Sequence, residues 1–153
     1  MSVAFRRESD DEHKEPEFEL PIPPGPNLVT ERGLRLIAEK IAALEAAIAA
    51  ATDAAREKAL RRELRYWTTQ HATARIAPPP PEGEAGLGSR VRYRLDGEER
   101  ELTIVGHDEA DPNEGLIAFS APLARSLMGA GEGDRVDFGE REGAIEVIEV
   151  EAR

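Results

Sequence analysis

Four consecutive prolines, Pro78 to Pro81, separate two stretches of the chain whose apolar residues repeat with different periods. Before the prolines, apolar residues recur every three or four positions, which is the period of one face of an α-helix. From Ser89 onward, apolar and polar residues alternate, as is typical of half-buried β-strands. A run of prolines favours an extended, semi-rigid spacer. The sequence therefore predicts a helical part and a β-rich part, joined by a Pro-rich linker over residues 78–88.

Residues 29–77 are predicted to form an antiparallel helical hairpin, a short coiled coil. Thr30 and Asp53 are the expected N-caps of its two helices, because short polar side chains accept hydrogen bonds from the first free amides. Each arm spans about twenty residues, hence roughly 30 Å at 1.5 Å per residue. Two apolar seams support the hairpin, namely Leu34, Ile37, Ile41, Leu44 and Ile48, then Leu60, Leu64, Trp67, His71 and Ala74.

Residues 89–153 are predicted to form a small antiparallel β domain with one short helix, which makes the fold class α+β. Asp96-Gly97 is a strong signal for a β-hairpin turn. Pro122 is expected to open the short helix. The residues expected in the core of this domain are Val91, Tyr93, Leu95, Leu123, Leu127, Met128, Ile145 and Val147.

Charge is distributed unevenly along the 153 residues, whose formal net charge is −11. Residues 27–77 hold nine basic and six acidic side chains, whereas residues 78–153 hold eight and eighteen. This balance argues against wrapping a nucleic acid over a broad surface. The absence of cysteine excludes disulfides, thiolate zinc sites and cysteine nucleophiles.

The first 28 residues are expected to be a disordered, acidic and Pro-rich tail. They lack the long apolar core of a secretion signal. No apolar run in the chain is long enough to cross a bilayer. We therefore expect a cytoplasmic protein with no membrane partner.

Two segments carry a resemblance to a known family: IVGHDEADP, from Ile104 to Pro112, and SAPLARSLMG, from Ser120 to Gly129. Followed by GDRVDF and a closing strand, they resemble the C-terminal domain of the bacterial GreA/GreB transcript-cleavage factors. The opening of the hairpin, LVTERGLRLIAEKIAALEA, is similar to the Thr-x-x-Gly cap before the family's first coiled-coil helix. The resemblance implies an FKBP-like fold for the β domain, with no isomerase activity expected.

The resemblance also implies a partner, RNA polymerase, whose secondary channel the family enters. The docking residues that it implies lie in the two segments and are Gly106, Asp108, Glu109, Asp111, Pro112, Ser120 and Pro122. Taken alone, the three carboxylates of this loop are more typical of a solvated acidic turn. Nascent RNA or DNA would be met only indirectly.

The family's chemistry lies at the tip of its coiled coil, in the pattern Gly-Asp-Leu-x-Glu-Asn-x-Glu-Tyr. There an acidic pair helps to hold a second magnesium ion for cleavage of RNA. The nearest match here is ALRRELRY, anchored on Tyr66, which places Ala59 and Arg62 at the acidic positions. Neither residue can ligate magnesium. We therefore expect no enzyme, no catalytic residues, no metal or cofactor, and modulation of transcription without stimulated cleavage.

Two alternatives stay open. Asp53 and Glu57, the acidic residues near the tip, could share the polymerase's Mg²⁺ in a genuine cleavage stimulator. The simpler interpretation is that Asp53 caps the second helix and Glu57 pairs with Arg61. The other alternative is a non-transcriptional interaction module with a Gre-like fold. The oligomeric state is not predicted.

A basic stripe on the second helix is formed by Lys58, Arg61, Arg62 and Arg65. Such a stripe is usually a solvated helix face. In a polymerase channel it would lie beside phosphates, for which its attraction is modest.

Overall fold

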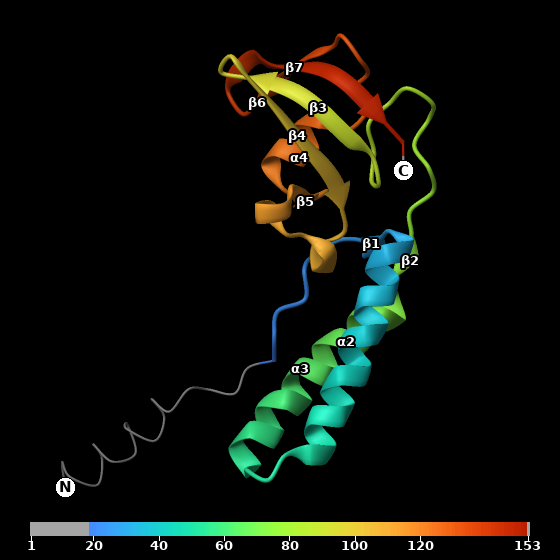
Figure 1. The fold of residues 1–153 in the computed structure, drawn as a ribbon, viewed down its shortest axis with the longest axis vertical. Coiled ribbons are helices and arrows are strands. Elements are labelled where there is room, and N and C mark those ends of the chain that lie inside the picture. The colour runs from blue at the N-terminus through green and yellow to red at the C-terminus, as the bar shows by residue number, and fades with distance from the viewer. Residues whose placement is uncertain (1–18, 153) are drawn as a thin grey trace, which may run out of the picture.

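A computed structural model describes residues 19–152 as a helical hairpin joined to a small β domain (Figure 1). The hairpin unit consists of β1 (Leu28–Val29), α2 (Glu31–Ala50), α3 (Ala54–Thr73) and β2 (Arg75–Ile76). The β domain contains β3 (Arg90–Leu95), β4 (Glu98–Val105), η1 (His107–Glu109), η2 (Pro112–Glu114), β5 (Leu116–Ala118), α4 (Pro122–Leu127), β6 (Arg135–Phe138) and β7 (Arg141–Glu151). The α+β class and the helical hairpin are confirmed. The predicted tail lies outside the described residues up to position 18.

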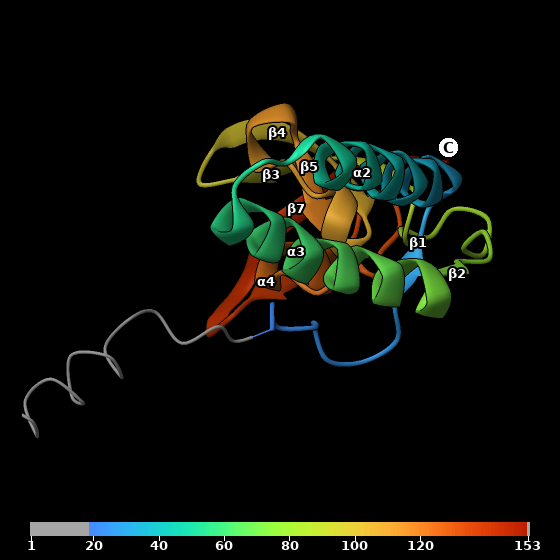
Figure 2. The same ribbon diagram turned by 90° about the horizontal axis from the view of Figure 1, so that it is seen from below.

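Both hairpin helices begin at the caps expected from the sequence. The Thr30 hydroxyl accepts a hydrogen bond from the Gly33 amide at 2.9 Å, and the Asp53 carboxylate accepts one from the Arg56 amide at 3.0 Å. Three residues, 51–53, connect the helices, so α2 and α3 lie side by side (Figure 2). β1 and β2 pair in parallel, which brings the chain into and out of the hairpin at the same end. None of the helices in the described part of the chain could span a membrane.

The apolar seams meet as predicted over most of the hairpin, with Ile37, Leu44 and Leu60 buried. The prediction for His71 is wrong, because its side chain is exposed. Its neighbour Gln70 is buried instead, at 1% exposure. The reason is that the end of α3 faces the β domain as well as α2, and the sequence pattern of an isolated hairpin cannot show this.

The five-stranded sheet has the order β5-β4-β3-β7-β6. Three of its four pairings are antiparallel, as predicted, but β5 runs parallel to β4. After β4, the two short helical turns η1 and η2 lead the chain back along the sheet. β5 can therefore run in the same direction as β4. α4 packs on the sheet, with Leu127 fully buried. Met128 was expected in the core but is 42% exposed, because α4 ends at Leu127.

A β-bulge at Ile148 interrupts the alternation of inward and outward side chains along β7. Tyr93 pairs with Val147 and Arg92 with Glu149, so Ile148 has no partner across the pair. The extra residue shifts the alternation, and Val150 returns to the inner face opposite Val91.

The β domain begins before the predicted boundary at Ser89. Ala85 is 3% exposed, lies in the core cluster and exchanges backbone hydrogen bonds with the segment at Gly129 and Ala130. The exposed spacer between hairpin and β domain is therefore shorter than residues 78–88, and its last part belongs to the packed domain.

Candidate functional site at the junction of hairpin and β domain

The loop that carries most of the predicted docking residues lies where the hairpin meets the β domain. η1 follows β4 and contacts both β1 and the start of α2. The contact is polar and is made by six side chains, which we call the junction: Thr30, Arg32, Tyr66, Gln70, Asp108 and Glu109.

Glu109 lies over the N-terminus of α2. Its Oε2 accepts a hydrogen bond from the Thr30 hydroxyl, and its Oε1 accepts one from Arg32 at 2.8 Å. The Glu109 side chain is 4% exposed, whereas that of Arg32 is 54% exposed. A carboxylate at this position is also stabilised by the positive end of the helix dipole. Glu109 is thus occupied inside the molecule and is not presented to a partner.

Two glycines allow this close approach. A Cβ at Gly33 would lie 2.9 Å from Oε2 of Glu109, and a Cβ at Gly106 would lie 2.6 Å from the carbonyl oxygen of Leu28. Gly106 is therefore needed for space against β1 and not for an unusual φ angle, which is −76°. The Thr-x-x-Gly pattern of the hairpin and the Val-Gly-x-x-Glu pattern of the β domain form two sides of one contact.

Asp108 is the second anchor of the junction and faces α3. Tyr66 donates its hydroxyl proton to Oδ1 at 2.5 Å, and Gln70 donates from Nε2 to Oδ2 at 2.7 Å. Burial raises the pKa of the Tyr66 hydroxyl well above its usual value, and the hydrogen bond and negative charge of Asp108 raise it further. Asp108 and Glu109 together attach the β domain to both helices.

The predicted docking residues therefore separate into two groups. Asp108, Glu109 and Gly106 face the hairpin, while a second group stays exposed or half-exposed at the surface: Asp111, Pro112, Ser120 and Pro122. In this second group, the Ser120 hydroxyl lies 3.2 Å from Nδ1 of His107, whose ring packs against Phe119. Of the three predicted docking carboxylates, Asp111 is the one whose side chain is exposed.

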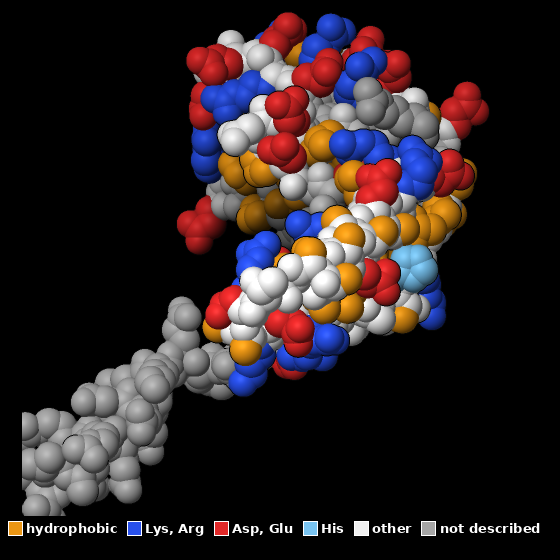
Figure 3. Space-filling model, turned by 60° about the horizontal axis from the view of Figure 1, so that its bottom comes forward, with side chains coloured by type: hydrophobic (Ala, Val, Ile, Leu, Met, Phe, Trp, Pro, Cys, Tyr) orange, Lys and Arg blue, Asp and Glu red, His pale blue; other side chains and the backbone are white. Residues whose placement is uncertain are grey.

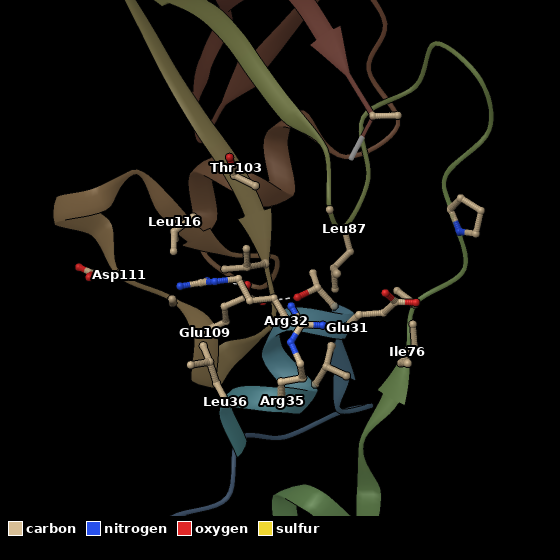
Figure 4. A pocket seen from close by; sticks show the side chains of 18 of the residues that line it. Glu31, Arg32, Arg35, Leu36, Ile76, Leu87, Thr103, Glu109, Asp111 and Leu116 are labelled. Atoms are coloured by element: carbon tan, nitrogen blue, oxygen red, sulfur yellow. Dashed lines mark hydrogen bonds and ion pairs between the residues drawn. The ribbon is translucent and has the colours of Figure 1, made fainter. Parts of the chain in front are cut away.

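A cleft of about 910 Å³ opens beside the junction (Figure 4). Arg32, Arg35 and Leu36 approach it from α2, Thr103 and Leu116 from the sheet, and Ile76 and Leu87 from the segments on either side of the prolines. Its lining mixes apolar side chains with charges of both signs. Within the described residues, no group of three or more His, Asp or Glu side chains is arranged to hold a metal ion.

At the tip of the hairpin, the two acidic candidates are engaged in local structure. Asp53 caps α3, and Glu57 forms an ion pair with Arg61 at 3.3 Å. In the basic stripe, the side chains of Arg61 and Arg65 are more than half exposed, whereas Arg62 is half-buried. Figure 3 shows Lys and Arg side chains gathered along the lower edge of the hairpin.

Three junction residues were missed by sequence reasoning: Arg32, Tyr66 and Gln70. One signal could have indicated the contact. Glycine in the first turn of a helix costs helix stability, so Gly33 points to a close approach by another group. The sequence offers no comparable signal for Tyr66, whose partner lies 42 positions away.

Comparison with known proteins shows which family the β domain is similar to. Residues 80–152 match the family model described as transcription elongation factor, GreA/GreB, C-term. The transcription elongation factor GreA of Nitratiruptor sp. is 43% identical over 86 residues, which cover 52% of each chain. GreA of Nautilia profundicola is 34% identical over 105 residues, which cover 64% of each chain. The chain thus spans about half the length of the first curated relatives that it matches.

Solved structures with a similar course of the chain include GreA factor homolog 1 of Thermus thermophilus. It is 17% identical, with a TM-score of 0.38 over 84% of this chain and all of that one. A GreA/GreB factor from Nitrosomonas europaea is 20% identical, with a TM-score of 0.39 over 84% of this chain and 99% of that one. The comparison depends on the sequence matches, by which residues 80–152 are similar to the GreA/GreB C-terminal domain.

Proposed function

We propose that this protein binds bacterial RNA polymerase at the secondary channel and modulates transcription from there, in the cytoplasm. The observation that carries the proposal is the GreA/GreB C-terminal domain over residues 80–152. The exposed residues at one end of this domain, Asp111, Pro112, Ser120 and Pro122, are the proposed docking surface. An exposed carboxylate directly before the rigid Pro112 suits a basic, partly apolar surface on the polymerase.

The junction supports a mechanical part of this role. Asp108 binds α3 and Glu109 binds α2, so both helices are held by neighbouring residues of one short turn. When the β domain docks, the direction of the hairpin is then fixed, and an arm of twenty residues per helix, roughly 30 Å long, is aimed into the channel. The rigid arm acts by occupying space near the active centre of the polymerase.

We further propose that the hairpin does not stimulate transcript cleavage. Cleavage of this kind needs carboxylate oxygens to hold a second magnesium ion. Ala59 and Arg62 occupy the positions of the family's acidic pair. The remaining candidates, Asp53 and Glu57, are used for capping and for the ion pair with Arg61.

Stalled elongation complexes with labelled RNA test both the binding at the channel and the absence of stimulated cleavage. We expect this protein to leave the RNA length unchanged and to reduce cleavage induced by an authentic GreA factor as its concentration rises. Shortened RNA produced by this protein alone would favour the second candidate, a cleavage stimulator. Asp53→Asn and Glu57→Gln would then have to abolish that activity. Absence of any competition with GreA would contradict binding at the channel.

A further inference from the structure

The cleft beside the junction has an apolar lining that comes from segments far apart in the sequence. Its volume of about 910 Å³ lies in the range of small-molecule sites in proteins, about 300–1,000 Å³. The Ile76 side chain lines the cleft and is 51% exposed, although it is large and apolar. The other large aliphatic side chains of the lining are Val29, Leu36, Leu87, Val105 and Leu116. A ligand with an apolar body would cover Ile76 and remove this surface from water.

Arg35 brings an unpaired positive charge to the same cleft. Its side chain is exposed, and within residues 19–152 it has no hydrogen bond or ion pair. Figure 4 shows Arg35 reaching from α2 into the cleft, close to Arg32. Arg32 uses Nη1 for Glu109, and its side chain is 54% exposed. A guanidinium group can bind a carboxylate through two parallel hydrogen bonds, so Arg35 suits a ligand that carries a carboxylate.

The acidic side chains of the lining restrict the charge of the ligand. Beside the two arginines, the cleft is lined by four carboxylates, namely Glu31, Glu109, Asp111 and Glu114. A polyanion such as a polyphosphate would be repelled by these groups. Because Arg32 already pairs with Glu109, Arg35 is the cation that remains for a ligand. The lining therefore favours a ligand with a single negative charge.

We propose that this cleft binds a small amphipathic monoanion, whose carboxylate pairs with Arg35 and whose apolar body packs against Ile76 and Leu36. The ligand contacts both the hairpin unit and the β domain, since both line the cleft. It stabilises the folded protein, because it binds the native state and not the unfolded chain. The site belongs to this chain alone and is tested without polymerase, so it stands or falls separately from the proposed function.

Titration of the ¹⁵N-labelled protein with decanoate, below its micelle concentration, tests the site. Decyltrimethylammonium is the matched probe, because it has a similar apolar chain and the opposite charge. We expect decanoate to shift the amide signals of residues 32–36 and of Ile76 and Leu87 in a saturable manner. The cation should bind at least about tenfold more weakly. Absence of saturable shifts at these amides, or equal affinities for the two probes, would overturn the proposal.

Two variants test the two ends of the ligand separately. Arg35→Gln should weaken decanoate binding about tenfold, because it removes the charged partner of the carboxylate. The control Arg56→Gln removes another exposed arginine, outside the cleft and at the tip of the hairpin, and should leave the affinity unchanged. Ile76→Thr keeps a β-branched side chain in β2 but reduces its apolar surface, and it should weaken binding about threefold. Unchanged affinity in Arg35→Gln or in Ile76→Thr, or equal losses in Arg35→Gln and Arg56→Gln, would overturn the proposal.

Discussion

The Thr30 side chain joins two parts of the molecule that lie 79 positions apart in the sequence, because its hydroxyl both caps α2 and donates a hydrogen bond to the buried carboxylate of Glu109. A helix start and a domain contact thus depend on one oxygen atom. If the first turn of α2 unfolds, the hairpin therefore also loses this hydrogen bond to the β domain.

Replacing Thr30 separates these two roles. Thr30→Val keeps the shape but removes the cap and the hydrogen bond to Glu109, and we expect a loss of about 2 kcal/mol or more in the free energy of unfolding. Thr30→Ser retains the hydroxyl and should stay close to wild type. Denaturant unfolding followed by circular dichroism measures the difference. Equal stabilities of the Val and Ser variants would contradict the dual role.

Asp53 provides the matched case of a cap without a domain contact, since its carboxylate accepts only the Arg56 amide in the described structure. Asp53→Ala should cost about 1 kcal/mol in the same unfolding experiment, within the usual range for an N-cap. The chemical shifts of η1 should not change. Shifts at His107–Glu109 in this variant would show that the tip and the junction are coupled.

The two junction glycines should differ in their sensitivity to substitution. In Gly106→Ala the new Cβ meets the backbone oxygen of Leu28 at 2.6 Å, and backbone cannot move without shifting β1. In Gly33→Ala the new Cβ meets the end of the Glu109 side chain at 2.9 Å. This side chain can turn away, but it then loses its hydrogen bonds. We expect the larger loss of stability for Gly106→Ala, of about 2 kcal/mol or more. The reverse order of the two melting temperatures would contradict this geometry.

Tyr66 makes the junction sensitive to high pH. Its pKa is raised in the folded state, first by burial and then by Asp108, so the folded protein holds this proton more tightly than the unfolded chain. The resulting stabilisation is complete below the pKa of an unfolded tyrosine, about 10, and is lost as the pH rises through the higher folded value.

The measurement is the difference in unfolding free energy between wild type and Tyr66→Phe as a function of pH. This difference should be constant from about pH 7 to pH 9. Above about pH 10, wild type should lose stability relative to Tyr66→Phe. Tyr93, whose pKa is also raised by burial, is present in both proteins and cancels in the difference. A flat difference up to pH 11 would show that Tyr66 is free to ionise in the folded state.

Local patterns predicted most of the fold. The seams around Ile37, Leu44 and Leu60, the caps Thr30 and Asp53, and the turn at Asp96-Gly97 depend on neighbours in sequence, and each appears in the structure. The parallel direction of β5 was not predicted, because it depends on how η1 and η2 turn the chain.

The candidate site was less accessible to sequence reasoning. The acidic residues at positions 108, 109 and 111 look alike in the sequence, and only the packing of the β domain on the hairpin determines which of them turn inward. Asp108 binds Tyr66 and Gln70, while Asp111 stays exposed. An interaction over some forty positions leaves no periodic pattern that could identify it in advance.

Binding to purified core RNA polymerase tests whether the β domain docks on the enzyme, with wild type, Asp111→Arg and the control Glu140→Arg compared in one pull-down. Both substitutions reverse one exposed charge on the β domain, but only Asp111 lies in the proposed docking surface. We expect wild type and Glu140→Arg to bind equally and Asp111→Arg to bind at least about fivefold more weakly. Failure of the wild-type protein to bind the polymerase would contradict the account.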